Sequence, residues 1–263
     1  GTGLNTFAEK YPNRYIDVAI AEQHAITYAA GLSASGVVPV IAIYSTFIQR
    51  AYDQIIHDLA LQKLPAVICM DRSGLVGEDG PTHHGIFDIS FLRIVPNLVV
   101  TSPKDGYELH DLLYTALESK KIFTIRYSKI ETLYKKSYIP KFLDIGKWEQ
   151  IIKGNEIAIY AIGSMVETSV KVSNLFKQND NMNISVYNCR YIKPLDENTI
   201  KETTINHQLI ITIEEGAKAG GFGSSLLEYL SKNNLNLNIH LIGIKDNFVN
   251  HGTRNELLEL TGL

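Results

Sequence analysis

Four polar segments directly follow apolar, β-branched runs, and their side chains could carry out chemistry together. They are Glu22, residues 44–50 (YSTFIQR), residues 71–88 (DRSGLVGEDGPTHHGIFD) and residues 126–129 (RYSK). Carboxyl, imidazole and guanidinium groups are suited to proton transfer and to anion binding. Because open parallel sheets bind ligands beyond the carboxyl ends of their strands, we expect these four segments to form one shared site.

Each candidate residue also has an interpretation without chemistry. An acidic residue in a first helical turn, such as Glu22, complements the helix dipole, which stabilises by about 0.3–1 kcal/mol. Phe47 taken alone is typical of a core residue. His83 and His84 are adjacent, so their side chains diverge, and no third ligand has metal-site spacing; we predict no metal. The loop at 71–88 is long and rich in glycine and charge, which favours a functional role.

A glycine-rich run, EEGAKAGGFGSS at 214–225, follows an apolar run and precedes a helical pattern. Backbone amides at such a helix start could bind an anion. The run matches neither GxxxxGK[ST] nor GxGxxG, so we favour a tight turn between strand and helix.

Short β-branched runs alternate with helical patterns along the whole chain, as in βαβ units. The runs lie at 15–20, 37–44, 66–71, 97–102, 123–127, 156–163, 183–188, 208–214 and 238–244. Most are continuously apolar, which is typical of parallel strands covered by helices on both faces. We predict an α/β fold made of two doubly wound domains with mostly parallel sheets.

The alternation lapses between residues 130 and 154, in a stretch rich in Lys, Tyr and Pro. We therefore predict a first domain at 1–133, a linker at 134–153 and a second domain at 154–263. In the first domain, a helix is expected over residues 47–63. Its apolar face carries Ile48, Tyr52, Ile55, Ile56 and Leu59 at spacings of three and four.

Composition narrows the class of protein. The chain has 263 residues, of which 45% are hydrophobic and 20% charged, with a net charge of −3. No basic face indicates nucleic acid, and no apolar run reaches the roughly 20 residues of a membrane span. We expect a cytoplasmic protein that binds small molecules. Cys69 and Cys189 lie far apart within apolar runs, so we expect buried free thiols.

Three segments together carry a resemblance to a known family: DVAIAEQHAITYAAGL, AIYSTFIQRAYDQIIHDLALQKLP and DRSGLVGEDGPTHHGIFDISFLR. They resemble the pyrimidine-binding and C-terminal domains of the 1-deoxy-D-xylulose-5-phosphate synthases, thiamine diphosphate enzymes of the transketolase superfamily. The resemblance covers essentially the whole chain and is far more specific in the first half.

The resemblance implies a chemical role for Glu22. Thiamine diphosphate reacts through a ring carbon that must lose a proton, and the cofactor's aminopyrimidine takes that proton in its imino form. Glu22 matches the family glutamate that hydrogen-bonds the pyrimidine ring nitrogen and stabilises this form. Phe47 matches the aromatic residue that stacks on the same ring.

The resemblance also implies the substrate-binding residues. Tyr44 and Arg72 match positions that hold the phosphate of glyceraldehyde 3-phosphate. Asp79 and His83 match loop residues that contact substrate near the reacting carbon, and His83 is suited to proton transfer. Arg50 is expected to shape the same pocket.

Two features depart from the family pattern. Where the family usually has RYPR, this chain has RYSK, so Lys129 keeps the charge but loses the bidentate fork. The run EDG at 78–80 is not the family's Gly-Asp-Gly motif for magnesium and diphosphate, because Glu78 replaces the first glycine and no downstream asparagine completes the pattern. We therefore expect the Mg²⁺ ligands in an N-terminal domain of the same polypeptide that this chain lacks, and we expect the chain alone to be inactive.

The implied activity is a transferase reaction of isoprenoid and thiamine biosynthesis. It condenses pyruvate with glyceraldehyde 3-phosphate to 1-deoxy-D-xylulose 5-phosphate and carbon dioxide, in a homodimer. Two alternatives stay open: a beta-type subunit of a 2-oxoacid dehydrogenase or split transketolase, and a non-catalytic assembly module. From the second domain we expect scaffold and dimer contacts and no catalytic residue.

Overall fold

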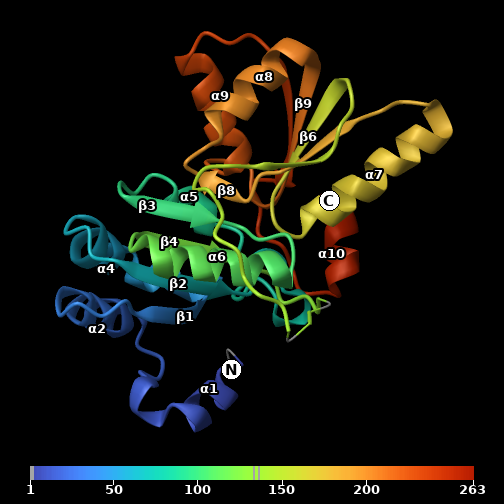
Figure 1. Cartoon of the computed structure of the whole chain (residues 1–263). Helices are drawn as coiled ribbons and strands as arrows, with labels where there is room; N and C mark the ends of the chain where they lie inside the picture. The colour runs from blue at the N-terminus through green and yellow to red at the C-terminus, as the bar shows by residue number, and fades with distance from the viewer. Residues whose placement is uncertain (1–2, 133, 136) are drawn as a thin grey trace.

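The molecule consists of two α/β lobes, one above the other in Figure 1, each built on a sheet with helices packed against it. The computed structural model describes residues 3–132, 134–135 and 137–263. The lower lobe contains the first half of the chain, and the upper lobe contains most of the second half.

The elements of the two lobes are as follows. The strands are β1 (Val40–Tyr44), β2 (Ala66–Asp71), β3 (Leu98–Thr101), β4 (Ile122–Arg126), β5 (Glu149–Ile152), β6 (Glu156–Ala161), β7 (Ser185–Asn188), β8 (Tyr191–Lys193), β9 (His207–Ala217) and β10 (Asn238–Ile244). The helices of the first half are α1 (Asn5–Lys10), η1 (Pro12–Arg14), α2 (Glu22–Ala34), α3 (Ser45–Ile48), η2 (Gln49–Ala51), α4 (Tyr52–Gln54), η3 (Ile55–Ala60), η4 (Gly77–Asp79), α5 (Asp88–Leu92) and α6 (Gly106–Ser119). The helices of the second half are α7 (Met165–Asp180), α8 (Glu197–Asn206), α9 (Phe222–Lys232) and α10 (Arg254–Thr261).

Each sheet combines parallel strands with one antiparallel edge strand. The order in the lower sheet is β1-β2-β4-β3-β8, and the order in the upper sheet is β10-β9-β6-β7-β5. β8 runs antiparallel to β3, β5 runs antiparallel to β7, and the other pairs are parallel. This topology confirms the predicted α/β fold with two mostly parallel sheets.

The strand predicted at residues 15–20 is wrong. This run forms no strand in the described part of the chain. The Asp17 carboxylate accepts a hydrogen bond from the Ala19 amide at 2.8 Å, and Ala19 has a left-handed φ of 55°. Ile20 is 85% exposed. A β-branched run becomes a strand only where a neighbouring strand pairs with its backbone, and here a local turn satisfies the backbone instead.

Two short strands were not predicted. β5 lies within the stretch 134–153, and β8 belongs to the second half of the chain yet joins the lower sheet, where Tyr191 pairs with Thr101. The Tyr191 side chain is fully buried. The two lobes therefore exchange backbone hydrogen bonds, and the division of domains at 134–153 stays a prediction.

The helix predicted at 47–63 is present as a continuous helical stretch from α3 to η3, with 3₁₀ turns in η2 and π geometry in η3. Ile48, Ile55 and Leu59 are fully buried against the lower sheet, and Tyr52 and Ile56 pack half-buried beside them. The predicted apolar face is thus confirmed.

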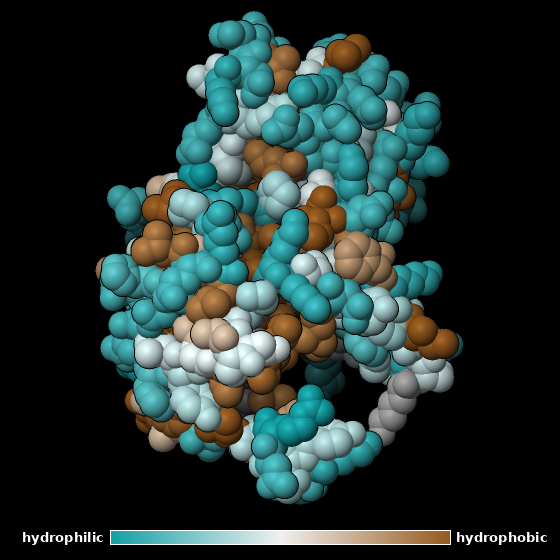
Figure 2. Space-filling model, turned by 60° about the vertical axis from the view of Figure 1, so that its left-hand side comes forward, coloured by the Kyte–Doolittle hydropathy of each residue, from teal (hydrophilic) through white to brown (hydrophobic). Residues whose placement is uncertain are grey.

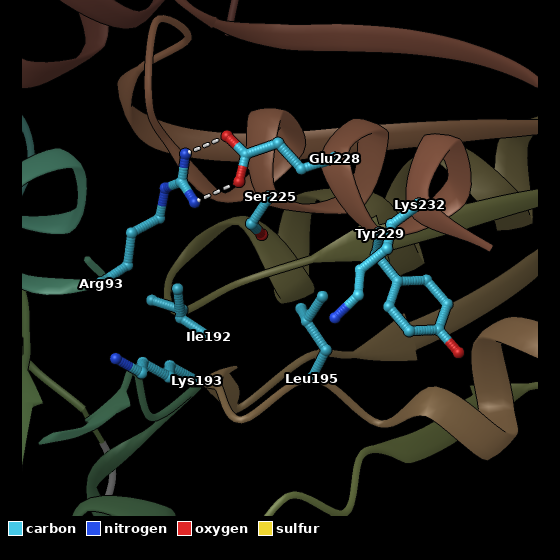
Figure 3. Close-up of a pocket in the computed structure, with 8 residues that line it drawn as sticks. All are labelled: Arg93, Ile192, Lys193, Leu195, Ser225, Glu228, Tyr229 and Lys232. Atoms are coloured by element: carbon cyan, nitrogen blue, oxygen red, sulfur yellow. Dashed lines mark hydrogen bonds and ion pairs between the residues drawn. The ribbon is translucent and has the colours of Figure 1, made fainter. Parts of the chain in front are cut away.

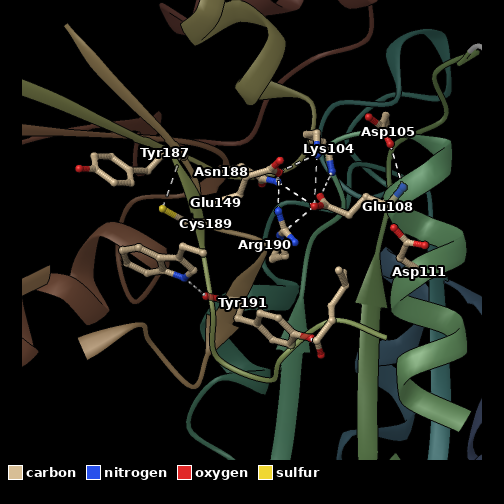
Figure 4. Close-up of polar contacts among 12 residues, drawn as sticks. Lys104, Asp105, Glu108, Asp111, Glu149, Tyr187, Asn188, Cys189, Arg190 and Tyr191 are labelled. Atoms are coloured by element: carbon tan, nitrogen blue, oxygen red, sulfur yellow. Dashed lines mark hydrogen bonds and ion pairs between the residues drawn. The ribbon is translucent and has the colours of Figure 1, made fainter. Parts of the chain in front are cut away.

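A polar network joins the lobes next to β8 (Figure 4). Glu108 of α6 is 3% exposed and forms an ion pair with Arg190 Nε at 2.8 Å and a hydrogen bond with Asn188 Nδ2 at 2.8 Å. Lys104 Nζ lies 2.8 Å from Glu149 and 3.5 Å from Glu108. Burial raises the pKa of Glu108 despite these partners.

Apolar packing is also continuous between the lobes. One core cluster includes Leu112 of the lower lobe and Tyr160 and Phe222 of the upper lobe. Figure 2 shows hydrophobic residues along the waist and on the lower lobe, whereas the upper lobe is largely hydrophilic on this face. Cys69 and Cys189 are buried free thiols, as predicted, and burial raises the pKa of Cys69 to about 12.

Candidate functional site

The candidate site begins with Glu22, the first residue of α2. The Glu22 side chain is 9% exposed, and its two carboxylate oxygens lie 3.1 and 3.3 Å from Nη1 of Arg50. The Arg50 side chain is 47% exposed. The helix start still favours an acidic residue, but the pairing with Arg50 ties Glu22 to the segment after β1. Its oxygens retain lone pairs for a further donor.

Aromatic rings extend the site from Arg50. Arg50 Cζ lies 4.9 Å from the centre of the Phe47 ring. Phe47 stacks on Tyr44 with ring centres 5.5 Å apart, and His83 meets Phe47 edge-on at 5.3 Å. Arg72 Cζ lies 3.8 Å from the centre of the Tyr44 ring. The half-buried Phe47 ring therefore contacts Tyr44, His83 and Arg50. Glu22 joins the cluster through Arg50, and Arg72 joins it through Tyr44.

Strand register explains why these residues meet. Tyr44, the last residue of β1, pairs with Asp71, the last residue of β2. The chain then turns sharply, because Arg72 adopts a left-handed φ of 60° and donates its amide to Asp71 Oδ1 at 2.7 Å. Arg72 Nη1 also bonds Asp71 Oδ2 at 2.8 Å. A non-glycine residue in this conformation is strained, and the two bonds to Asp71 compensate for the strain.

A buried ion pair holds the loop at 71–88 against the end of β1. The Asp88 Oδ2 atom accepts hydrogen bonds from Arg126 Nε at 2.9 Å, Ser45 Oγ at 2.9 Å and Ser73 Oγ at 3.2 Å. The Arg126 and Asp88 side chains are only 4% and 0% exposed. Sequence reasoning located the segment 126–129 but selected Lys129, so it missed Arg126. A charged last residue in a continuously apolar strand was the available signal.

Gly85 brings this loop into close contact with β1. A Cβ atom at Gly85 would lie 2.4 Å from Ser45 Oγ and 2.5 Å from the Arg72 carbonyl oxygen. Gly85 also exchanges two backbone hydrogen bonds with Gly74, at 2.8 and 2.9 Å. The ends of the loop are therefore closed and fixed beside Ser45, the neighbour of Tyr44.

The two predicted histidines diverge, as expected. His83 points toward Phe47, and its Nδ1 lies 2.9 Å from Thr82 Oγ1. His84 is 3% exposed, accepts the Val76 amide on Nδ1 at 3.1 Å and places Nε2 3.2 Å from the Asn250 carbonyl oxygen. Among the residues that the structure describes, no group of three His, Cys, Asp or Glu side chains could hold a metal ion.

The structure therefore brings together Glu22, Tyr44, Phe47, Arg50, Arg72 and His83. It does not bring the other two predicted residues into this cluster. Asp79 and Lys129 are exposed, and neither side chain has a hydrogen bond or ion pair with a described residue. The roles of all eight residues stay predictions.

The glycine-rich run at 214–225 turns from β9 into α9, and its amides already have an acceptor within the chain. The Glu214 carboxylate accepts the amides of Phe222 and Gly223, each at 2.8 Å. Burial raises the pKa of Glu214 to about 7. The run therefore offers no free cradle for a phosphate at this helix start.

A separate cavity of about 270 Å³ lies between Arg93 and α9 (Figure 3). The guanidinium group of Arg93 already has partners: Nη1 and Nη2 donate to the Glu228 carboxylate at 2.9 and 2.5 Å, and Nε donates to the Gly220 carbonyl oxygen. Lys193 donates to the Val95 carbonyl. Arg93 and Lys193 are therefore satisfied by partners within the chain.

Comparison with known proteins agrees with the fold of two α/β domains. The family model of the transketolase pyrimidine-binding domain matches residues 1–133, and that of the transketolase C-terminal domain matches residues 146–263. The 1-deoxy-D-xylulose-5-phosphate synthase of Aquifex aeolicus is 45% identical over the whole chain, and that of Dictyoglomus turgidum is 46% identical. The chain spans 42% and 43% of the lengths of these two relatives, less than half of each.

Solved structures show the same fold. A split gene transketolase, described as an inactive beta4 tetramer, superposes with a TM-score of 0.87 at 26% identity, over 98% of this chain and 82% of that one. The transketolase of Campylobacter jejuni superposes with a TM-score of 0.76 at 21% identity, over 94% of this chain and 37% of that one. In the described residues, no helix is long and apolar enough to cross a membrane.

The two family models show that the chain belongs to the transketolase superfamily, with a pyrimidine-binding domain followed by a C-terminal domain.

Proposed function

We propose that this chain is the pyrimidine-binding and C-terminal part of a 1-deoxy-D-xylulose-5-phosphate synthase. Such an enzyme condenses pyruvate with glyceraldehyde 3-phosphate and releases carbon dioxide. The observation that carries the proposal is the cluster of Glu22, Arg50, Phe47 and His83, found in a chain 45% identical to a synthase along its whole length.

The residues of the cluster fit the aminopyrimidine of thiamine diphosphate. Phe47 offers a half-buried flat face, and Glu22 supplies a carboxyl group beside it through their shared partner Arg50. When bound, the cofactor supplies the nucleophilic carbon for the attack on pyruvate. Glu22 contributes a hydrogen bond to the ring nitrogen, and Arg50 orients the Glu22 carboxyl group.

The loop residues fit the acceptor substrate. Arg72 Nε is buried and has no hydrogen-bond partner among the described residues, so it is a donor ready for a phosphate oxygen. Tyr44 supplies a hydroxyl group at the same place. His83 has Nδ1 engaged with Thr82, which leaves Nε2 for moving a proton.

The proposal includes further parts that the family resemblance implies. Asp79 contacts the substrate, and Lys129 takes the place of an arginine that binds phosphate. Mg²⁺ and the diphosphate bind to an N-terminal domain of the same polypeptide, so the chain alone has no synthase activity. The whole enzyme is a cytoplasmic homodimer.

A second candidate has a specific observation in its favour. The split gene transketolase structure is a beta chain by itself, and this chain covers 82% of it. A separate subunit would bind a partner chain that carries the Gly-Asp-Gly motif. The coding sequence upstream of Gly1 distinguishes the two: an open frame continuous with this chain favours the synthase.

The catalytic proposal can be tested in a fusion of this chain to the N-terminal part of the Aquifex aeolicus synthase. The fusion is expected to form 1-deoxy-D-xylulose 5-phosphate from pyruvate and glyceraldehyde 3-phosphate. Glu22→Gln is expected to lower kcat by about 10²- to 10⁴-fold. Glu167→Gln, on a side chain 76% exposed, is the control and should keep the rate. Full activity of the Glu22 variant would contradict the proposal and favour a non-catalytic assembly module.

A further inference from the structure

The loop at 71–88 is held in place by a residue of the other domain. Glu215, near the end of β9, is 2% exposed and accepts the Leu75 amide on Oε1 at 2.8 Å. The two residues are 140 positions apart in the sequence. A buried amide that lost this acceptor would have no water to replace it, so the bond restrains the loop backbone.

The other oxygen of Glu215 is held by its own domain. Ser164, just before α7, donates to Glu215 Oε2 at 2.7 Å, and Arg254, the first residue of α10, donates from Nη2 at 2.6 Å. The Glu215 carboxylate thus bonds the loop through Oε1 and the starts of α7 and α10 through Oε2. The position of Leu75 therefore depends on how the upper lobe sets the Glu215 side chain.

Steric contact adds to this bond. Gly74 has a φ of 84°, and a Cβ atom there would lie 2.7–2.9 Å from the carboxyl end of Glu215. Two further hydrogen bonds lie at the same place: Ala217 N donates to Ile86 O at 2.8 Å, and the Arg126 side chain donates from Nη2 to Glu215 O at 3.2 Å. The carboxylate therefore lies directly against the closed ends of the loop.

We infer that Glu215 is a positioning residue for the substrate loop, through which the C-terminal domain sets where His83 and Arg72 lie beside Phe47. The second domain is then more than a scaffold, because it determines the geometry of the site without touching the substrate. The inference rests on the proposed function only in taking 71–88 as the substrate loop.

Amide hydrogen exchange of this chain, without substrate, tests the restraint. In Glu215→Ala, exchange across residues 72–86 is expected to rise by about 5- to 150-fold, the range for a buried amide that loses its acceptor. Glu215→Gln keeps a carbonyl oxygen for Leu75 but loses the ion pair with Arg254, so it should restore part of the protection. Glu167→Gln should exchange like the wild type, because that side chain is 76% exposed and pairs only with Lys171.

Should Glu215→Ala fail to fold, Ser164→Ala serves instead, because it removes only one support from Oε2 and should raise exchange of the loop in the same direction but less. The inference would be overturned if the Glu215→Ala variant folds and its loop exchanges as in the wild type. If that variant does not fold, the same result for a folded Ser164→Ala variant would overturn it. The exchange result is independent of whether the chain takes part in synthase chemistry.

A kinetic readout separates positioning from general stability. In the fusion described above, at a temperature where both variants are fully folded, Glu215→Ala should lower kcat/KM for glyceraldehyde 3-phosphate by about tenfold or more, and Glu215→Gln should recover part of this loss. Equal rates for Glu215→Ala and the wild type would show that the loop needs no positioning by this residue. A fusion without any activity would count against the proposed function, while the exchange data would still decide the inference.

Discussion

Replacing Arg126 by methionine tests whether its ion pair with Asp88 stabilises the site. Methionine fills a similar volume but leaves the Asp88 carboxylate buried and without a cation, with the Ser45 and Ser73 hydroxyl groups and the Ile89 amide as its donors. Breaking a buried pair by removing one partner costs about 3–5 kcal/mol. The bonds from Arg126 to two carbonyl oxygens, at 3.2 and 3.3 Å, are lost in the same change. At roughly 2–4 °C per kcal/mol, Tm should fall by about 6–20 °C.

Urea denaturation followed by the fluorescence of Trp148, the only tryptophan, measures this loss. The matched control is Lys171→Met, because its ion pair with Glu167 is shorter, at 2.6 Å, but 70% and 76% exposed. The control should lose less than about 0.5 kcal/mol. In the double variant Asp88→Asn/Arg126→Met neither of the two positions carries a buried charge, so part of the stability should return. An Arg126→Met variant that loses less than about 1 kcal/mol would refute the reasoning.

Three further predictions concern stability. Gly85→Ala should lower the free energy of unfolding by about 1–3 kcal/mol, because its methyl group would lie 2.4 Å from the nearest atom. Gly31→Ala has open space in α2 and should raise the free energy of unfolding by about 0.5–1 kcal/mol. Urea denaturation measures both changes. Since burial raises the pKa of Glu214 from 4.5 to about 7, the native state keeps a proton that the unfolded state loses. The free energy of unfolding should therefore fall by about 3 kcal/mol in total as pH rises from 4.5 to 7. Denaturation across this range should show that Glu214→Gln removes this fall. Arg190→Met should lower the free energy of unfolding by about 1–3 kcal/mol, less than Arg126→Met does, because Glu108 keeps other partners. Faster hydrogen exchange at the start of α6 should accompany this loss of stability.

Local sequence patterns predicted the elements well where neighbours on the chain decide the structure. Continuous apolar runs marked the parallel strands of both sheets, and spacings of three and four marked the buried face with Ile48 and Ile55. The start of α2 at Glu22 was also predicted. These features follow from the periods of strand and helix, which are present in the sequence itself. The run at 15–20 shows the limit, because its composition suits a strand but no other strand pairs with it.

The sequence by itself determined the plan of two α/β domains and marked the segments whose six candidate residues meet in the structure. Only the tertiary structure decided which charges pair, because such pairs join residues far apart in the chain. Asp88 and Arg126 are separated by 38 positions, and Glu215 and Leu75 by 140. No local period encodes these separations, and burial makes the partners necessary only after the lobes have packed.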